Sequence, residues 1–271
     1  MTWLATIVLG VATVTFQDAL TTAVKAVLPL DGLHDSLSPQ DALQTVEVRD
    51  VKDNGRYLYR GRDGAGFLKG LNAASLVDRT DLMDVGDAAW LVTLRGNATQ
   101  QVRVTDIVPV VEGGGCDAPT GGSLVYSPSQ GGEDVLALDA AIDAPVPRLH
   151  EDGAKGPFFT GPKAREFTFD QGESWSFLLR ASATTGHCRW HYRIHYQVGG
   201  RTAEENLTAP HGRPFELTAE LPDPGDYRVV YLPRFICPNS AELGSRGWTT
   251  ADGRWYARGP AKNKAPDCPR N

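Results

Sequence analysis

The chain has 271 residues, enough for one or two domains with a hydrophobic core of useful size. Hydrophobic residues make up 41% and charged residues 22% of it, which argues against wholesale disorder and against a polytopic membrane protein. The formal net charge is -6, so the chain lacks a generally basic surface and we expect no nucleic-acid partner. The 29 glycines and 18 prolines are typical of a turn-rich β protein rather than a helix bundle.

The N-terminal region is apolar. Its first sixteen residues carry no charged side chain, but a helix of that length reaches only about 24 Å, short of the ~30 Å hydrocarbon core. A span over about residues 3–24 is long enough and places Asp18 near one headgroup layer. We therefore predict a membrane anchor in residues 1–30, with the lipid bilayer as its partner. A cleaved signal peptide is the first alternative, although no Lys or Arg precedes the apolar run, and a buried soluble helix is the second.

The four cysteines are compatible with an oxidising compartment, and none belongs to a CxxC pair of the kind used by zinc ribbons and thioredoxin-type centres. Of the three pairings, we favour Cys237 with Cys268, because this bridge closes a Pro- and Gly-rich segment with little core of its own. A loop of about thirty residues gains about 3–4 kcal/mol in the chain-entropy description. Cys116 is then left to pair with Cys188. Free buried thiols stay open as the alternative.

Strand patterns begin at residue 43 and predict two hairpins. Residues 45–51 alternate between apolar and polar side chains, and an Asp-Asn-Gly turn signal separates them from residues 56–60. The second pair comprises residues 89–94 and 101–107.

Residues 113–163 are rich in glycine and proline and contain short strand-like islands at residues 124–126 and 135–138. They either link two domains or form long connections within one domain. We favour one domain, because strand signals never stop for long and no low-complexity run occurs. Beyond them, residues 167–169 and 175–183 flank a turn and predict a further β pair.

Residues 187–198 give the clearest strand pattern, which a Gly-Gly turn joins to residues 201–208. Alternate side chains point to opposite faces of a strand. The face that we expect to be buried carries Cys188, Trp190, Tyr192, Ile194 and Tyr196. The face that we expect to be exposed carries His187, Arg189, His191, Arg193 and His195.

Two further patterns complete the fold prediction. A Gly-x-Tyr motif ending at Tyr227 resembles the tyrosine corner of immunoglobulin-like sandwiches. Residues 248–255 suggest a hairpin around Asp252 and Gly253. About a dozen short strands predict an all-β, immunoglobulin-like β-sandwich over residues 42–236, elaborated or divided into two domains. A disulfide-closed C-terminal extension over residues 237–271 follows it.

Several loose motifs carry a resemblance that covers about residues 88–220. They are WLVTLRGN (residues 90–97), VRVTDI (102–107), YSPSQGG (126–132), Gly172-Glu173, HCRW (187–190) and HGRPF (211–215). Together they resemble uncharacterised proteins of high-GC Gram-positive bacteria that have one N-terminal membrane segment and an extracytoplasmic β-rich region. The resemblance implies an outward topology and a Cys116–Cys188 bridge. It implies no activity and no catalytic residues.

The histidines are the best candidates for site chemistry. His187, His191 and His195 lie four residues apart, which on a helix would place them around one metal ion. On a strand, however, four residues span about 13 Å, so no two of them could share an ion without help from another strand. The aromatic and β-branched content favours the strand, and we expect a solvated cationic ladder. The sharper hypothesis is an anion-binding or pH-responsive surface.

Two other groups are candidate sites with simpler structural explanations. Asp78, Asp81, Asp84 and Asp87 could ligate calcium, but the EF-hand spacing is absent and we favour a solvated loop or a helix cap. Trp248, Trp255 and Tyr256 could line a carbohydrate platform, but cross-strand pairs in a hairpin are the preferred interpretation.

No local enzyme signature occurs, which lowers an enzyme interpretation without excluding it. We expect no enzyme activity and no cofactor. The predicted function is a membrane-anchored extracytoplasmic module for binding, sensing or structural support, with an envelope component or a protein as its partner. The alternatives are a secreted hydrolase acting on cell-envelope material and a metal- or anion-binding module that uses the His187–His195 face.

Overall fold

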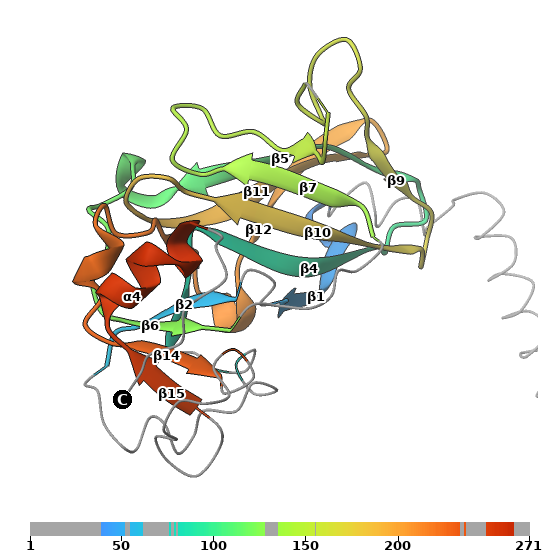
Figure 1. Cartoon of the computed structure of the whole chain (residues 1–271). Coiled ribbons are helices and arrows are strands. Elements are labelled where there is room, and N and C mark those ends of the chain that lie inside the picture. The colour runs from blue at the N-terminus through green and yellow to red at the C-terminus, as the bar shows by residue number, and fades with distance from the viewer. Residues whose placement is uncertain are drawn as a thin grey trace, which may run out of the picture.

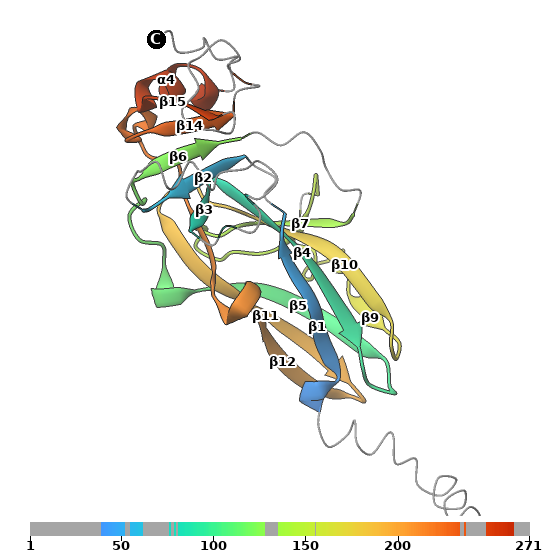
Figure 2. The ribbon, with the colours of Figure 1, turned by 90° about the horizontal axis from the view of Figure 1, so that it is seen from below.

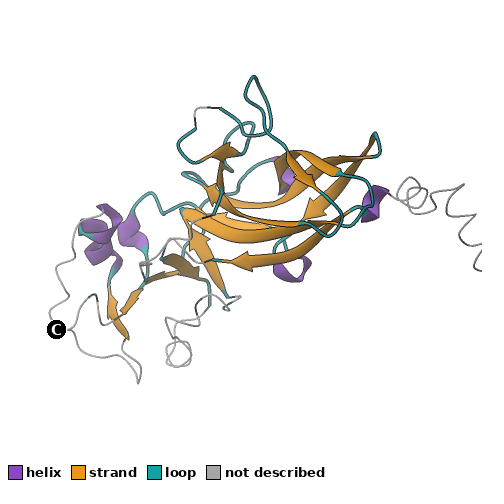
Figure 3. Cartoon of the chain, turned by 90° about the vertical axis from the view of Figure 1, so that its right-hand side faces the viewer, coloured by secondary structure: helices purple, strands orange, loops and turns teal. Residues whose placement is uncertain are grey.

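The computed structural model describes residues 39–51, 55–61, 76, 79, 81–127, 135–154, 156–233, 236 and 248–262. In this part of the chain strands predominate and the helices are short (Figures 1 and 3). The strands form two sheets, and the smaller sheet packs against β5, β9, β11, β12 and β13 of the larger one around the main hydrophobic core, which confirms the predicted all-β sandwich.

The smaller sheet has five strands. Its order is β1 (Leu43–Asp50), β4 (Asp87–Gly96), β10 (Ser174–Ser182), β7 (Ala137–Ala141) and β8 (His150–Glu151). All its neighbours are antiparallel except β10 and β7, which run parallel.

The larger sheet has ten strands. Its order is β15 (Trp248–Ala251), β14 (Val230–Pro233), β6 (Ser123–Tyr126), β2 (Arg56–Tyr59), β3 (Leu82–Val85), β13 (Phe215–Thr218), β11 (His187–Val198), β5 (Val102–Val111) and β9 (Phe167–Phe169). The tenth strand, β12 (Arg201–Leu207), pairs with β11.

The described helices are one short α-helix and single turns of 3-10 helix. They are η1 (Pro39–Asp41), η3 (Glu112–Gly114), η4 (Pro210–Gly212), η5 (Pro224–Asp226), α4 (Gly253–Arg258) and η6 (Pro260–Lys262). In the described part of the chain no helix combines the length and the apolar character needed to cross a bilayer. The predicted anchor in residues 1–30 lies outside the described residues.

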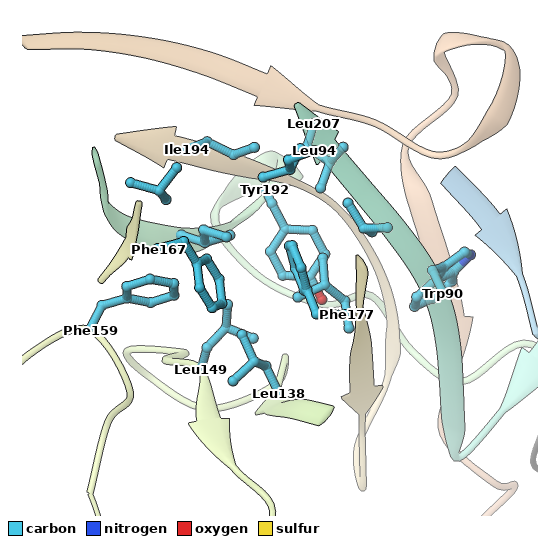
Figure 4. Packing of buried hydrophobic residues seen from close by; sticks show 14 of the residues in the cluster. Trp90, Leu94, Leu138, Leu149, Phe159, Phe167, Phe177, Tyr192, Ile194 and Leu207 are labelled. Carbon is cyan, nitrogen blue, oxygen red and sulfur yellow. The ribbon is translucent and has the colours of Figure 1, made fainter. Parts of the chain in front are cut away.

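The core between the sheets is aromatic. Trp90 of β4 meets Trp190 of β11 edge to face, with ring centroids 5.7 Å apart, and contacts Phe215 of β13 at 4.8 Å. Phe177 of β10 and Tyr192 of β11 fill the neighbouring space (Figure 4). Each large apolar side chain buried in this way contributes about 1.5–3 kcal/mol, and an aromatic pair adds about 0.5–1.5 kcal/mol. These contacts hold the two sheets together.

Strand β11 confirms the clearest prediction from the sequence. The five residues expected to be buried are all in the core, and the alternate ones are more accessible. The hairpin with β12 is also confirmed, with Val198 opposite Arg201 across the Gly-Gly turn. Gly199 and Gly200 have φ values of 56° and 77°, a region that favours glycine.

The other three predicted strand pairs are wrong. Strand β1 pairs with β4, whereas β2 pairs with β3 and β6 in the other sheet. Likewise β4 and β5 belong to opposite sheets, as do β9 and β10. Alternation shows which face of a strand is buried but does not identify its partner. In each case the two strands belong to different sheets.

The predicted hairpin around Asp252 and Gly253 is also wrong. The chain enters helix α4 there, because the Asp252 carboxylate accepts a hydrogen bond of 2.7 Å from the Trp255 backbone N–H. An aspartate with this bond is a good helix N-cap. Strand β15 pairs instead with β14, and the predicted boundary at residue 237 lies outside the described residues.

Helix α4 and the strands below it surround a second cluster of buried side chains. Tyr227 and Tyr256 pack edge to face there, with ring centroids 5.8 Å apart. The Leu221 backbone N–H donates to the Tyr227 hydroxyl oxygen at 3.3 Å. Tyr227 therefore fastens the loop before it, as the Gly-x-Tyr motif predicts.

Candidate functional site

A cleft of about 530 Å³ opens between strand β1 and the loop that leads into β13. Its walls come from three distant parts of the chain, residues 48–50, 79–84 and 209–216, with single contributions from β4 and β11. Figure 2 shows β1 in blue on the same side of the molecule as the orange turn η4, with β2 and β3 beside them. The volume lies within the range of small-molecule sites.

The inner part of the cleft is apolar. Trp90, Leu82 and Met83 line it, each less than a tenth exposed. Asp84 of β3 also lines it and is only 3% exposed. An apolar floor with a few fixed polar groups is typical of ligand-binding sites.

The remaining lining is rich in basic side chains, namely those of Arg49, Arg79, Arg189, Arg213 and His211. Two of the arginines have carboxylate neighbours on their own segment, since Arg49 lies 3.4 Å from Glu47 and Arg79 binds Asp81. The hydrogen bond from Arg79 lowers the pKa of Asp81.

The loop before β13 holds His211 in an unusual conformation. Its φ is 66°, the one positive φ outside glycine among the described residues, and Gly212 follows with a φ of 71°. The Ala209 backbone N–H donates to the Arg213 carbonyl at 2.9 Å and closes the loop. A left-handed residue other than glycine costs about 1–2 kcal/mol, and such residues concentrate at functional sites.

Glu216 lies at the edge of the cleft and is already paired. Its Oε1 lies 2.6 Å from Arg60 Nη2 and 2.7 Å from His187 Nε2. Burial acts to raise the pKa of Glu216, but the hydrogen bonds from Arg60 and His187 hold it below its usual value. The Glu216 carboxylate is therefore charged, and it is already paired with two basic side chains at the edge of the cleft.

The histidine face of β11 differs from the expected solvated cationic ladder. His187 binds Glu216, and His195 Nδ1 lies 3.1 Å from Glu204 Oε1. His191, between them, has a buried Nε2 with no hydrogen-bond partner in the described part of the chain. Four of the five side chains are partly buried, and two of the histidines are paired with carboxylates, because β12 and β13 place Glu204 and Glu216 beside them.

The strand geometry also keeps these histidines apart, as the spacing argument predicts for a strand. Among the residues that the structure describes, no group of three or more His, Cys, Asp or Glu side chains is arranged to hold a metal ion.

The aspartate cluster is dispersed. Asp81 pairs with Arg79, and Asp87 lies 2.9 Å from Arg56. The expectation of a solvated loop or helix cap is wrong for Asp84, which lies buried on β3. Asp78 lies outside the described residues.

The aromatic residues near the C-terminus do not form a carbohydrate platform. Trp248, Trp255 and Tyr256 are 3%, 6% and 0% exposed. Nor do they pair across a hairpin, because Trp255 and Tyr256 belong to α4 and pack into the second cluster.

The Cys116–Cys188 disulfide is present and joins the start of β11 to the segment after η3. A second cavity, of about 700 Å³, lies beside it and is lined by Asp117, Asp143 and Thr185 among others. The Asp143 carboxylate accepts bonds from the backbone and hydroxyl groups of Thr184 and Thr185, which hold its pKa below the usual value against the effect of burial. Asp143 thus shapes the turn before β11. Cys237 and Cys268 lie outside the described residues.

No protein-family model and no curated protein matches this chain. The candidate site therefore depends on its geometry. Sequence patterns did not reveal the cleft, because its walls lie up to about 170 residues apart along the chain and meet only in the folded sandwich. Among the short sequence motifs singled out above, HGRPF (residues 211–215) contributes the most lining residues to the cleft, and it contains the left-handed His211.

Proposed function

We propose that the chain is a membrane-anchored extracytoplasmic binding module whose ligand occupies the cleft between β1 and the loop before β13. The cleft itself is the observation that carries the proposal, because it combines an apolar floor, a rim of cationic side chains and a strained loop. The anchor is the apolar N-terminal segment.

The disulfide supports the extracytoplasmic part of the proposal. Bonds such as Cys116–Cys188 persist in oxidising compartments and are rare in the reducing cytosol. We also propose an immunoglobulin-like arrangement for the sandwich. The contact between Leu221 and the Tyr227 hydroxyl supports it, since a tyrosine corner makes a similar bond.

Fractionation with thiol labelling tests the location. The full chain is expressed in a bacterial host, and a membrane-impermeant maleimide is added before and after reduction. We expect the chain in the membrane fraction, with Cys116 and Cys188 labelled only after reduction and without breaking the cells. A chain in the cytosolic fraction with four reactive thiols would contradict the proposal.

Ligand binding is tested by thermal shift with fragments of cell-wall polysaccharide and of cell-wall peptide. A bound fragment raises the unfolding temperature by mass action. We expect a shift that is lost in Arg213→Gln and kept in Arg254→Gln, because Arg254 is exposed on α4 outside the cleft. Absence of any shift would contradict a binding module for envelope components, and turnover of a fragment would favour the hydrolase alternative.

A further inference from the structure

We propose that the cleft recognises a phosphate group on its ligand through Arg189, Arg213 and His211. The inference rests on the proposed function, because it takes the cleft as the binding site. It adds the chemical class of the group that is bound.

The charges around the cleft favour an anion. Four arginines and His211 face three carboxylates, those of Asp50, Asp84 and Glu216. Glu216 is occupied by Arg60 and His187, and Asp84 is buried in the floor. Two of the three carboxylates are therefore not available to the outer arginines, which still outnumber the remaining one, Asp50.

Arg189 and Arg213 retain donors for a ligand. The Arg189 guanidinium is half-exposed, and its nearest carboxylate among the described residues, Glu112, lies 3.8 Å away. Within the part of the chain that the structure describes, the Arg213 guanidinium makes one hydrogen bond, a long one of 3.5 Å from Nε to the Pro210 carbonyl. A guanidinium fork binds phosphate oxygens in pairs, and such bonds are about twice as strong as neutral ones.

The position of His211 gives an independent argument. Glycine would adopt its φ of 66° without strain, yet the chain carries a histidine there, exposed on the wall of the cleft. An imidazole can donate a hydrogen bond to an oxyanion. With the two arginines, it supplies donors from two elements, β11 and the loop before β13. A phosphate group, with more charge and more acceptor oxygens than a carboxylate, can accept from all three.

The same phosphate chemistry can come from a free metabolite or from a lipid headgroup, and the experiment separates these sources. The full chain in detergent micelles is titrated calorimetrically at low salt with sn-glycerol 3-phosphate, with glycerol as the uncharged control. Nanodisc-bound chain is then mixed with vesicles of phosphatidylglycerol or phosphatidylcholine. Binding of glycerol 3-phosphate alone identifies a soluble ligand, and binding of phosphatidylglycerol vesicles identifies a headgroup.

We expect saturable binding that weakens at least tenfold in Arg213→Gln and at least fivefold in Arg189→Gln, and that also weakens with added salt. Arg254→Gln, the matched surface control, keeps the wild-type affinity. His211→Gly weakens binding while raising the unfolding temperature, because it removes the imidazole and relieves the backbone strain. This opposite response separates loss of a ligand contact from misfolding.

Equal losses in Arg213→Gln and Arg254→Gln would overturn the inference, because they would indicate nonspecific attraction. Absence of binding to either phosphate probe would also overturn it. If cell-wall fragments still shift the unfolding temperature in that case, the binding module stands and only the phosphate assignment fails. If they do not, both proposals fail.

Discussion

Gly186 occupies a crowded position at the entrance to β11. Its φ is 83°, and a Cβ there would lie 2.5 Å from the Asp117 carbonyl oxygen and 2.9 Å from the Cys116 Cβ. The Asp117 backbone cannot easily move away, because it exchanges two hydrogen bonds with His187. Steric crowding and backbone strain therefore act together at this glycine.

We expect Gly186→Ala to lower the free energy of unfolding by about 3 kcal/mol, measured by urea denaturation. Gly200→Ala is the matched control, because its φ of 77° is similar but nothing lies within 4 Å of the added Cβ. In Gly200→Ala the free energy of unfolding should fall by only about 1 kcal/mol, the cost of placing a residue other than glycine at a positive φ. Equal losses in the two variants would show that crowding at Gly186 is unimportant.

Glu205 places a carboxylate on the buried face of β12, beside Ala203 and Leu207. Its Oε1 accepts a bond of 3.3 Å from the Thr45 hydroxyl, while Oε2 is buried with no hydrogen-bond partner in the described part of the chain. Burial raises the pKa of Glu205, and the hydrogen bond from Thr45 opposes this only in part. The folded chain therefore binds this proton more tightly than the unfolded chain does.

This contribution to stability is complete below the unfolded pKa of about 4.5 and is lost as the pH rises through the higher folded pKa. We expect Glu205→Gln to match the wild type near pH 4 and to exceed its unfolding free energy at pH 7. Urea denaturation between pH 4 and pH 8 measures the difference. Glu204→Gln, on the exposed face beside His195, should show no such gain. A loss at pH 7 in Glu205→Gln would contradict the argument.

At the scale of elements, helix α4 shows how one side chain sets a boundary. The Asp252 carboxylate caps the first turn through the Trp255 N–H, and Trp255 and Tyr256 then pack into the second cluster. We expect Asp252→Ala to lower the free energy of unfolding by about 1 kcal/mol, and Asp252→Asn to restore most of it, as measured by thermal denaturation. If Asp252→Asn lost as much as Asp252→Ala, the capping bond would not be the cause.

The sequence predicted individual strands better than their connections. The alternation in residues 187–198 identified both faces of β11, because strict alternation over twelve residues has one structural explanation. Turn motifs were less informative, since an Asp-Gly or Asn-Gly pair looks alike in a hairpin, in a crossover and before a helix. Near Asp252 the sequence did contain an argument against a hairpin. Trp255 and Tyr256 are adjacent, and adjacent residues of a strand point to opposite faces, so a strand could not bury both on one face.

At the scale of the whole molecule, the Cys116–Cys188 bridge links positions 72 residues apart. In the chain-entropy description a loop of this length stabilises the fold by about 4 kcal/mol. We expect Cys116→Ser with Cys188→Ser, or full reduction, to lower the free energy of unfolding by about this amount in urea. Amide exchange at Gly186, next to the bridge, should then become faster. Equal stability with and without reductant would contradict the bridge.

The candidate site belongs to this scale as well, which explains why the sequence did not identify it. Arg189 was recognised only as part of a polar strand face, and His211 and Arg213 only as part of a short motif. Their common surface depends on how β11, β13 and β1 meet across two sheets. Periodicity describes each strand separately and contains no such information.

The order in which the chain supplies its strands has a consequence for biogenesis. Successive strands change sheets seven times between β1 and β11. The smaller sheet lacks its central strand until residues 174–182 have been synthesised, and the larger one is completed only by β15. Neither sheet is therefore complete early in synthesis, so no part of the sandwich can fold before the later strands emerge. Pairings between strands that are distant in sequence also form slowly. We therefore expect the two sheets to assemble only after most of the chain has left the ribosome, so that ribosome-bound chains ending before β10 remain open to protease.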